Sequence, residues 1–238
     1  MIALGDSVTH GWGVGEDQSW SARLQAHLAA AGHDVQVINA GVPASRVRGM
    51  ASWCETQAAS LEPDLLIWAR RPGFDDPRPY NKFIEAMTRC RAAIGTPVLV
   101  VLPPISTFDF HGERVWREEH QELRQRLGRQ RVEVVELTGH FREAQAGEGE
   151  VLQRDDGFVR VVDQQTGAIR LEVSDRGDFL PDAIYQLFEA DADVREALFF
   201  DDGHPDARGY DLFARIVSRP AAAVLEGADP GMLRRRPP

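Results

Sequence analysis

Ile2-Ala3-Leu4-Gly5-Asp6-Ser7-Val8-Thr9 places a serine directly after a short apolar run. Such a run, closed by a glycine, is typical of a strand buried on both faces of a parallel sheet. In parallel α/β sheets, ligands bind beyond the carboxyl ends of the strands. The stretch therefore predicts a strand over residues 2–4 with Ser7 at the ligand-binding edge.

The rest of the chain continues the same alternation of short apolar runs and amphipathic segments. Further strands are predicted over residues 35–38, 65–69, 98–102 and 132–135. Helices are predicted over residues 20–31, 46–61, 79–94 and 113–128. Short strands separated by helices predict a parallel five-stranded sheet covered on both faces, a three-layer α/β/α architecture.

Residues 151–180 interrupt this alternation and are interpreted as an insertion. Two β-type runs, 158–162 and 168–173, flank a turn that contains Gly167 and predict a β-hairpin. The insertion is either a decoration or a rim over the ligand-binding edge. A helical pattern resumes over residues 181–198. We expect one domain over residues 1–226 and a disordered tail over residues 227–238.

Composition narrows the class of protein. The formal net charge is −10, which argues against a nucleic-acid partner. No apolar run approaches the roughly 20 residues of a membrane span. Cys54 and Cys90 suit buried apolar thiols, with a single bridge between them as the alternative. No metal or organic cofactor is expected. No signal peptide is seen, so the expected location is cytoplasmic, with export if an N-terminal segment is missing.

A second polar motif, Asp201-Asp202-Gly203-His204-Pro205, lies near the other end of the chain. A serine hydroxyl becomes a strong nucleophile when a base takes its proton. The base works better when an acid orients it and stabilises its protonated form. We therefore expect Ser7 as nucleophile, His204 as base and Asp201 as the acid, with Asp202 as the competing acid. Asp6 is interpreted as a local structural acid that binds amides in its turn.

Together, Gly5-Asp6-Ser7, Asn39-Ala40-Gly41 and Asp201-x-x-His204-Pro205 resemble the motifs of the SGNH/GDSL hydrolase family. The resemblance spans about residues 1–226 and implies a flavodoxin-like sheet and serine acyl transfer. It also implies that the Ser7 and Gly41 amides bind the oxyanion. The implied partner is a small-molecule ester, and the oligomeric state is not indicated.

This chain departs from the family's pattern in the third block of motifs. Where the family reads roughly Gly-x-Asn-Asp, this chain has Ala69-Arg70-Arg71-Pro72-Gly73-Phe74-Asp75-Asp76. Matching the glycines puts Asp75 in the asparagine position, and an ionised aspartate cannot donate a hydrogen bond. An arginine could donate strongly. We favour Arg71 as the replacement, with Arg70 and Asn81 as alternatives.

The expected function is hydrolysis of short-chain or O-acetyl esters on a polar or carbohydrate-like molecule. Trp12, in the loop after Ser7, is a candidate substrate contact, and packing against the domain is its alternative. An O-acyltransferase with the same chemistry is the first alternative function. A non-catalytic binding domain is the second, since the third block is altered.

Overall fold

A computed structural model gives the fold of the chain. It describes residues 1–70, 79–106, 110–146, 148, 150–155, 158–174, 198–201 and 203–227. The predicted helix over 181–198 falls outside the described residues except for Leu198, and the predicted tail does so except for Gly227. The division into one domain over residues 1–226 stays a prediction.

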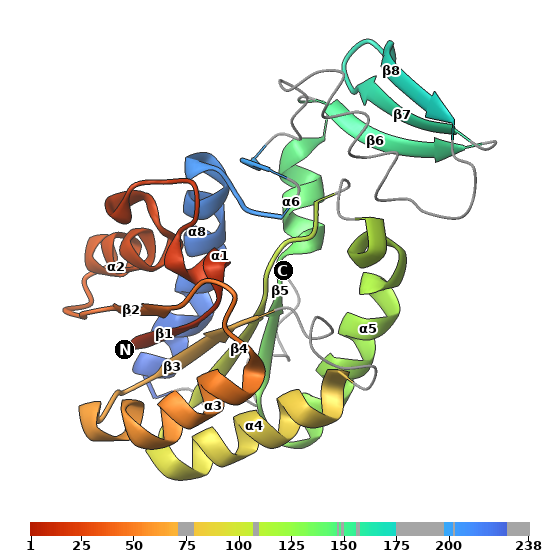
Figure 1. The fold of residues 1–238 in the computed structure, drawn as a ribbon. Coiled ribbons are helices and arrows are strands. Elements are labelled where there is room, and N and C mark those ends of the chain that lie inside the picture. Colours follow the sequence, from red (N-terminus) through yellow and green to blue (C-terminus); the bar gives the residue numbers. More distant parts are fainter. Residues whose placement is uncertain are drawn as a thin grey trace.

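A parallel five-stranded sheet forms the centre of the molecule, with strand order β2-β1-β3-β4-β5. The strands are β1 (Ile2–Gly5), β2 (Ile38–Gly41), β3 (Leu66–Ala69), β4 (Val98–Leu102) and β5 (Glu133–Glu136). Helices follow the strands and cover both faces (Figure 1). The predicted three-layer α/β/α fold with flavodoxin-like strand order is thereby confirmed.

Alternate residues of each strand enter different cores, because successive side chains of a strand point to opposite faces. In β3, Ile67 and Ala69 pack with one cluster of buried residues, whereas Leu66 and Trp68 pack with the other. All four are fully buried. This double burial explains why the inner strands β1, β3 and β4 are continuous apolar runs in the sequence.

Two sets of helices supply the other halves of these cores. On one face lie α2 (Trp20–Ala30), α6 (Thr138–Gln145) and α8 (Ala207–Leu225). On the other lie α3 (Val47–Thr56), α4 (Pro79–Ile94) and α5 (Phe110–Arg129). Short 3₁₀ turns, η1 (Glu16–Gln18) and η2 (Ala58–Leu61), precede α2 and β3. The eight-residue α6 was not predicted.

The second strand lies later in the chain than predicted. Pairing with β1 runs from Ile2↔Ile38 to Gly5↔Gly41, so β2 covers residues 38–41 instead of 35–38. Val35 and Val37 still pack against the core, which is why they looked like strand residues. A Cβ on Gly41 would lie 2.1 Å from the His10 amide nitrogen. Only glycine lets the segment after β1 approach this closely.

The insertion is a three-stranded antiparallel sheet instead of the predicted hairpin. Its strands are β6 (Glu150–Asp155), β7 (Phe158–Asp163) and β8 (Ile169–Ser174), in the order β6-β7-β8. The β7–β8 hairpin is present as predicted, with Gly167 at positive φ in its turn. The sequence Glu-Val-Leu-Gln-Arg-Asp of β6 carries only two apolar residues, so its pattern was too weak to recognise.

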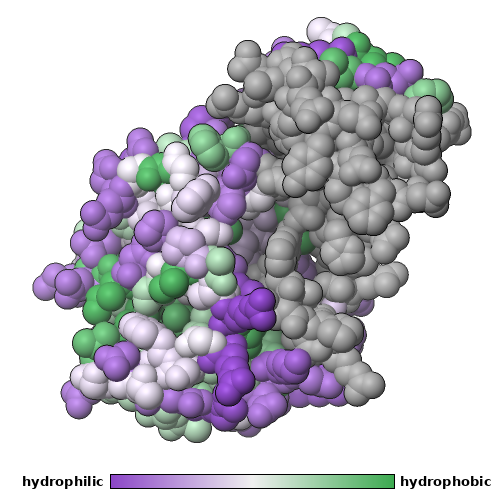
Figure 2. All heavy atoms as spheres, viewed as in Figure 1, coloured by the Kyte–Doolittle hydropathy of each residue, from purple (hydrophilic) through white to green (hydrophobic). Residues whose placement is uncertain are grey.

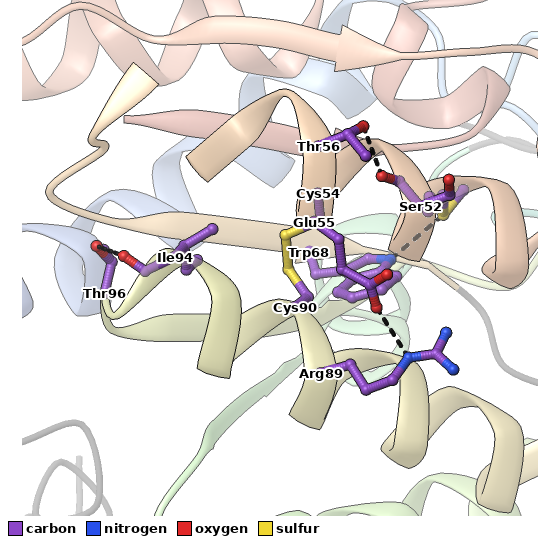
Figure 3. The surroundings of a disulfide bond; sticks show 10 residues. Ser52, Cys54, Glu55, Thr56, Trp68, Arg89, Cys90, Ile94 and Thr96 are labelled. Atoms are coloured by element: carbon purple, nitrogen blue, oxygen red, sulfur yellow. Dashed lines mark hydrogen bonds and ion pairs between the residues drawn. A yellow bond between two sulfur atoms is a disulfide. The ribbon is translucent and has the colours of Figure 1, made fainter. Parts of the chain in front are cut away.

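The two cysteines form a disulfide, which corrects their interpretation as free thiols. The Cys54–Cys90 bridge joins α3 to α4, and both residues are fully buried (Figure 3). The Cα atoms lie 5.4 Å apart, within the range that a bridge needs. Each half-cystine lies on a helix face turned to the same core, and this made both look like apolar core residues.

Candidate active site

The serine lies at the start of a one-turn helix that follows β1. Helix α1 (Ser7–His10) has four residues, and Asp6 is its N-cap. The Val8 amide donates to Asp6 Oδ1 at 3.1 Å, so Asp6 does bind a backbone amide in its turn, as expected. A Cβ on Gly5 would lie 2.0 Å from Thr9 Oγ1 and 2.5 Å from the Ala69 carbonyl oxygen. Glycine is therefore required where the turn meets the sheet.

The histidine is held by a short loop before α8. The Phe200 amide donates to the His204 carbonyl oxygen at 2.7 Å, and Phe199 forms an isolated β-bridge with Pro205. Asp206 then caps α8 by accepting from the Gly209 amide at 2.8 Å. These bonds fix the backbone on both sides of His204, so its ring direction is set by local structure.

Ser7, His204 and Asp201 form one hydrogen-bonded series. His204 Nε2 lies 2.8 Å from Ser7 Oγ. On the other side of the ring, His204 Nδ1 lies 2.9 Å from Asp201 Oδ1 and 2.8 Å from Oδ2. Both side chains of the pair are partly exposed, 23% for His204 and 34% for Asp201. The three residues expected from the sequence are thus brought together; Asp202 lies outside the described residues.

The local environment favours an ionised Asp201. Burial raises the pKa of this carboxyl, but the hydrogen bond from the His204 ring and those from the Gly203 and His204 amides lower it by more. The net pKa lies below its ordinary range. A carboxylate that stays ionised keeps the Nδ1–H tautomer of His204, and Nε2 then accepts the serine proton.

Asp201→Asn is expected to lower kcat by about 10³–10⁴-fold, because an amide can stabilise the wrong histidine tautomer.

The same substitution should also change the stability of the fold at acid pH. Because the folded-state pKa of Asp201 is depressed, its stabilising contribution is full above about pH 4 and is lost as the pH falls through the lowered value. Urea unfolding between pH 6 and pH 2 would measure this contribution. An unchanged pH dependence in the variant would contradict it.

Trp12 lies beside the histidine. The ring centroids of Trp12 and His204 are 6.2 Å apart, and Trp12 is 49% exposed as a residue. Tyr210, fully buried on α8, donates to the Trp12 carbonyl oxygen at 3.4 Å. Burial, together with the charges of Asp201 and Asp6, raises the pKa of the Tyr210 phenol, so it remains a donor. The backbone of Trp12 is therefore tied to α8, and Trp12 is a partly exposed residue beside His204.

The two backbone amides expected to bind the oxyanion differ in whether they already donate a hydrogen bond. The Ser7 amide is at the first position of α1, where it has no acceptor in its own helix. The Gly41 amide donates to Asn39 Oδ1 at 2.9 Å. It can therefore bind an oxyanion only after the Asn39 side chain turns away.

The three candidates for the third oxyanion donor, Arg71, Arg70 and Asn81, lie in different surroundings or outside the described residues. Arg71, the favoured one, lies outside the described residues, as does Asp75. Arg70 is 4% exposed, and its Nη1 donates to Asp6 Oδ2 and the Ser45 carbonyl oxygen, both at 2.8 Å. Asn81 is exposed on α4, and its Oδ1 accepts from Arg126 of α5 at 2.6 Å. Its observed contact is thus with a neighbouring helix.

A cavity of about 610 Å³ elsewhere is not part of this site. Its lining includes Gly95, Thr96, Pro97 and Val98, where the chain enters β4. That is the amino edge of the sheet, whereas Ser7 follows the carboxyl end of β1. Among the residues that the structure describes, no three His, Cys, Asp or Glu side chains gather to hold a metal ion. None of the described helices is long and apolar enough to cross a membrane.

The fold is α/β, and the hydrogen-bonded series of Ser7, His204 and Asp201 includes the serine that follows the carboxyl end of β1. A family model described as the GDSL-like Lipase/Acylhydrolase family matches residues 3–161, more than half of the chain. The chain therefore belongs to this family and is an esterase-type hydrolase. No curated protein sequence matches it.

Solved structures of similar fold agree with this family. A lipolytic G-D-S-L family protein from Veillonella parvula DSM 2008 has 19% identity and a TM-score of 0.57, covering 99% of this chain and 98% of that one. A family 3 carbohydrate esterase from Clostridium thermocellum has 13% identity and a TM-score of 0.58, covering 95% and 97%. The acetyl xylan esterase AlAXEase has 15% identity and a TM-score of 0.54, covering 91% and 96%.

Proposed function

We propose that this protein hydrolyses short-chain or O-acetyl esters of a polar or carbohydrate-like alcohol by a Ser-His-Asp mechanism. The observation that supports the mechanism best is the unbroken series from Ser7 Oγ through His204 to Asp201, with each link at 2.8–2.9 Å. A serine this close to an oriented imidazole is an activated nucleophile.

In the first half of the reaction, Ser7 Oγ attacks the ester carbonyl while His204 Nε2 takes its proton. The Ser7 amide, with the Gly41 amide once Asn39 releases it, donates to the negative oxygen of the tetrahedral intermediate. The intermediate expels the alcohol, which receives the proton from His204, and leaves an acyl-serine. Water, deprotonated by His204, then attacks the acyl-serine. The bond between the acyl carbon and Ser7 Oγ breaks, His204 returns the proton to Ser7 Oγ, and the acid is released.

Surface character supports a small, polar substrate. On the face shown in Figure 2, the described hydrophobic residues form small separate groups among hydrophilic ones. Trp12 is a partly exposed aromatic residue beside His204, where the alcohol part of an ester would lie as it takes its proton. An aromatic ring at this position suits the C–H side of a sugar ring. The carbohydrate esterases of similar fold support this preference.

A panel of esters tests the proposal. We expect p-nitrophenyl acetate to be turned over faster than the octanoate, and acetylated xylo-oligosaccharides to release acetate. Adding an alcohol acceptor should leave the yield of free acetate unchanged. Preference for the octanoate, with no acetate released from the oligosaccharides, would contradict the proposed substrate class. Acetate diverted to the alcohol would favour the transferase.

Trp12→Ala is expected to lower kcat/KM for the acetylated oligosaccharide by about 10-fold, since an alanine forfeits the aromatic contact. Turnover of p-nitrophenyl acetate should change less than 3-fold. Leu61→Ala is a matched control, because Leu61 is also 49% exposed but precedes β3, at the opposite edge of the sheet. An equal loss on both substrates would show that Trp12 supports the site without selecting the alcohol.

A further inference from the structure

Arg70 carries a charge that burial makes costly. It follows β3 directly, and its amide donates to the Val101 carbonyl oxygen of β4 at 3.0 Å. The residue is 4% exposed. A cation removed from water this completely must be paired and hydrogen-bonded. The position of its partners therefore shows what the guanidinium holds together.

Those partners lie on two other segments of the site. Nη1 of Arg70 donates at 2.8 Å to Asp6 Oδ2 and at 2.8 Å to the carbonyl oxygen of Ser45. The other oxygen of Asp6 caps the helix that begins at Ser7. Ser45 in turn donates through Oγ to the Gly5 carbonyl oxygen at 3.3 Å. One guanidinium thus joins the end of β3, the turn before Ser7 and the loop after β2.

The turn that carries Ser7 needs such support. Helix α1 has four residues, too few to be stable by its own backbone bonds. A serine nucleophile must keep both its hydroxyl and its amide in place, and small displacements cost large factors in rate. Asp6 is the residue next to Ser7, so whatever orients the Asp6 carboxylate also orients the start of α1.

We infer that Arg70 is a positioning residue, which fixes Ser7 by holding the Asp6 carboxylate. This role rests on the proposed function, because it presupposes that Ser7 is the nucleophile. Arg70 acts through Asp6, because its side chain is buried and its Nη1 is engaged by the Asp6 carboxylate and the Ser45 carbonyl oxygen.

The test compares wild type with Arg70→Lys, Arg70→Met and the Asp6→Asn/Arg70→Met double variant. Readouts are kcat and KM on p-nitrophenyl acetate, the rate of labelling by a fluorophosphonate, and urea unfolding. The double variant removes both charges together, and Asn keeps an N-cap. Arg89→Met is the control, because Arg89 is a 51% exposed arginine whose Nε donates to Glu55, on α3.

Arg70→Met should lower kcat and the labelling rate by about 100-fold, with KM within 3-fold. Arg70→Lys should recover at least 10-fold of the loss, and Arg89→Met should match wild type. The double variant should be more stable than Arg70→Met yet equally slow. Recovery of kcat with stability in the double variant would overturn the positioning role and leave a structural one. A wild type neither active nor labelled would instead overturn the proposed function, and this role with it.

Discussion

Ser7→Ala is expected to lower kcat/KM for p-nitrophenyl acetate by about 10⁴-fold or more, because the oxygen that attacks the ester carbonyl is removed. Ser7 Oγ lies 2.8 Å from His204 Nε2, so the change leaves the base without its proton donor. The alanine variant should fold normally, since the lost hydroxyl is partly exposed and small. Steady-state kinetics above the spontaneous hydrolysis rate would measure the loss.

Ser52→Ala is the matched control for this prediction. Ser52 is an exposed serine on α3, and its substitution should leave kcat/KM within 2-fold of wild type. His204→Ala should be as slow as Ser7→Ala, and combining the two should cost little more, because the residues act as one unit. Substantial turnover by Ser7→Ala in a protein of native circular dichroism would contradict the assigned nucleophile.

Removing the disulfide should have the largest effect on stability. The Cys54–Cys90 bridge closes a loop of sequence separation 36, for which the chain-entropy relation gives about 4 kcal/mol. The free energy of unfolding of a globular domain is about 5–15 kcal/mol, so losing the bridge removes a large fraction of it. Urea unfolding of Cys54→Ala/Cys90→Ala against wild type would measure it.

Reduction without substitution separates the bridge from the packing of its sulfur atoms. Wild type unfolded, reduced and refolded with excess thiol keeps both side chains and should lose a similar free energy of unfolding. Thiol titration of the denatured, unreduced protein should find no free cysteine. Two free thiols, or a difference below about 1 kcal/mol, would contradict the bridge's role.

The bridge bears on where the protein acts. Disulfides persist in oxidising compartments and are rare in the cytosol, where thiols are kept reduced. A buried structural bridge therefore does not fit easily with the cytoplasmic location expected from the sequence. That location stays a prediction, and the redox state of the two cysteines in cell extracts would test it.

The centre of the sheet was predictable because its inner strands β1, β3 and β4 are buried on both faces. Leu66, Ile67 and Trp68 all had to be apolar, and this leaves a continuous run that needs no tertiary information to recognise. The boundary of β2 was not predictable from composition, because Val35 and Val37 pack on the core without pairing in the ladder. Strand β6 was missed because most of its residues are polar.

The site, too, was predictable only where local sequence determines it. Ser7, His204 and Asp201 stand in two short motifs, and the sequence was enough to predict that these three side chains meet. Their catalytic roles stay predictions. The Asp6–Arg70 pair needed the strand register, since the two residues directly follow the paired residues Gly5 and Ala69 on neighbouring parallel strands. The disulfide likewise needed the packing of α3 on α4, because nothing in the spacing of Cys54 and Cys90 distinguishes a bridge from two core thiols.

The most direct test of the proposed mechanism is to find which residue a fluorophosphonate labels. Attack by the nucleophile forms a phosphorus–oxygen bond and expels fluoride, leaving a stable adduct on the activated hydroxyl alone. Peptide mass spectrometry should place one adduct per chain on Ser7, with none in Ser7→Ala and slow labelling in His204→Ala. An adduct on another serine, or none in a preparation that hydrolyses p-nitrophenyl acetate, would contradict the assignment of Ser7 as the nucleophile.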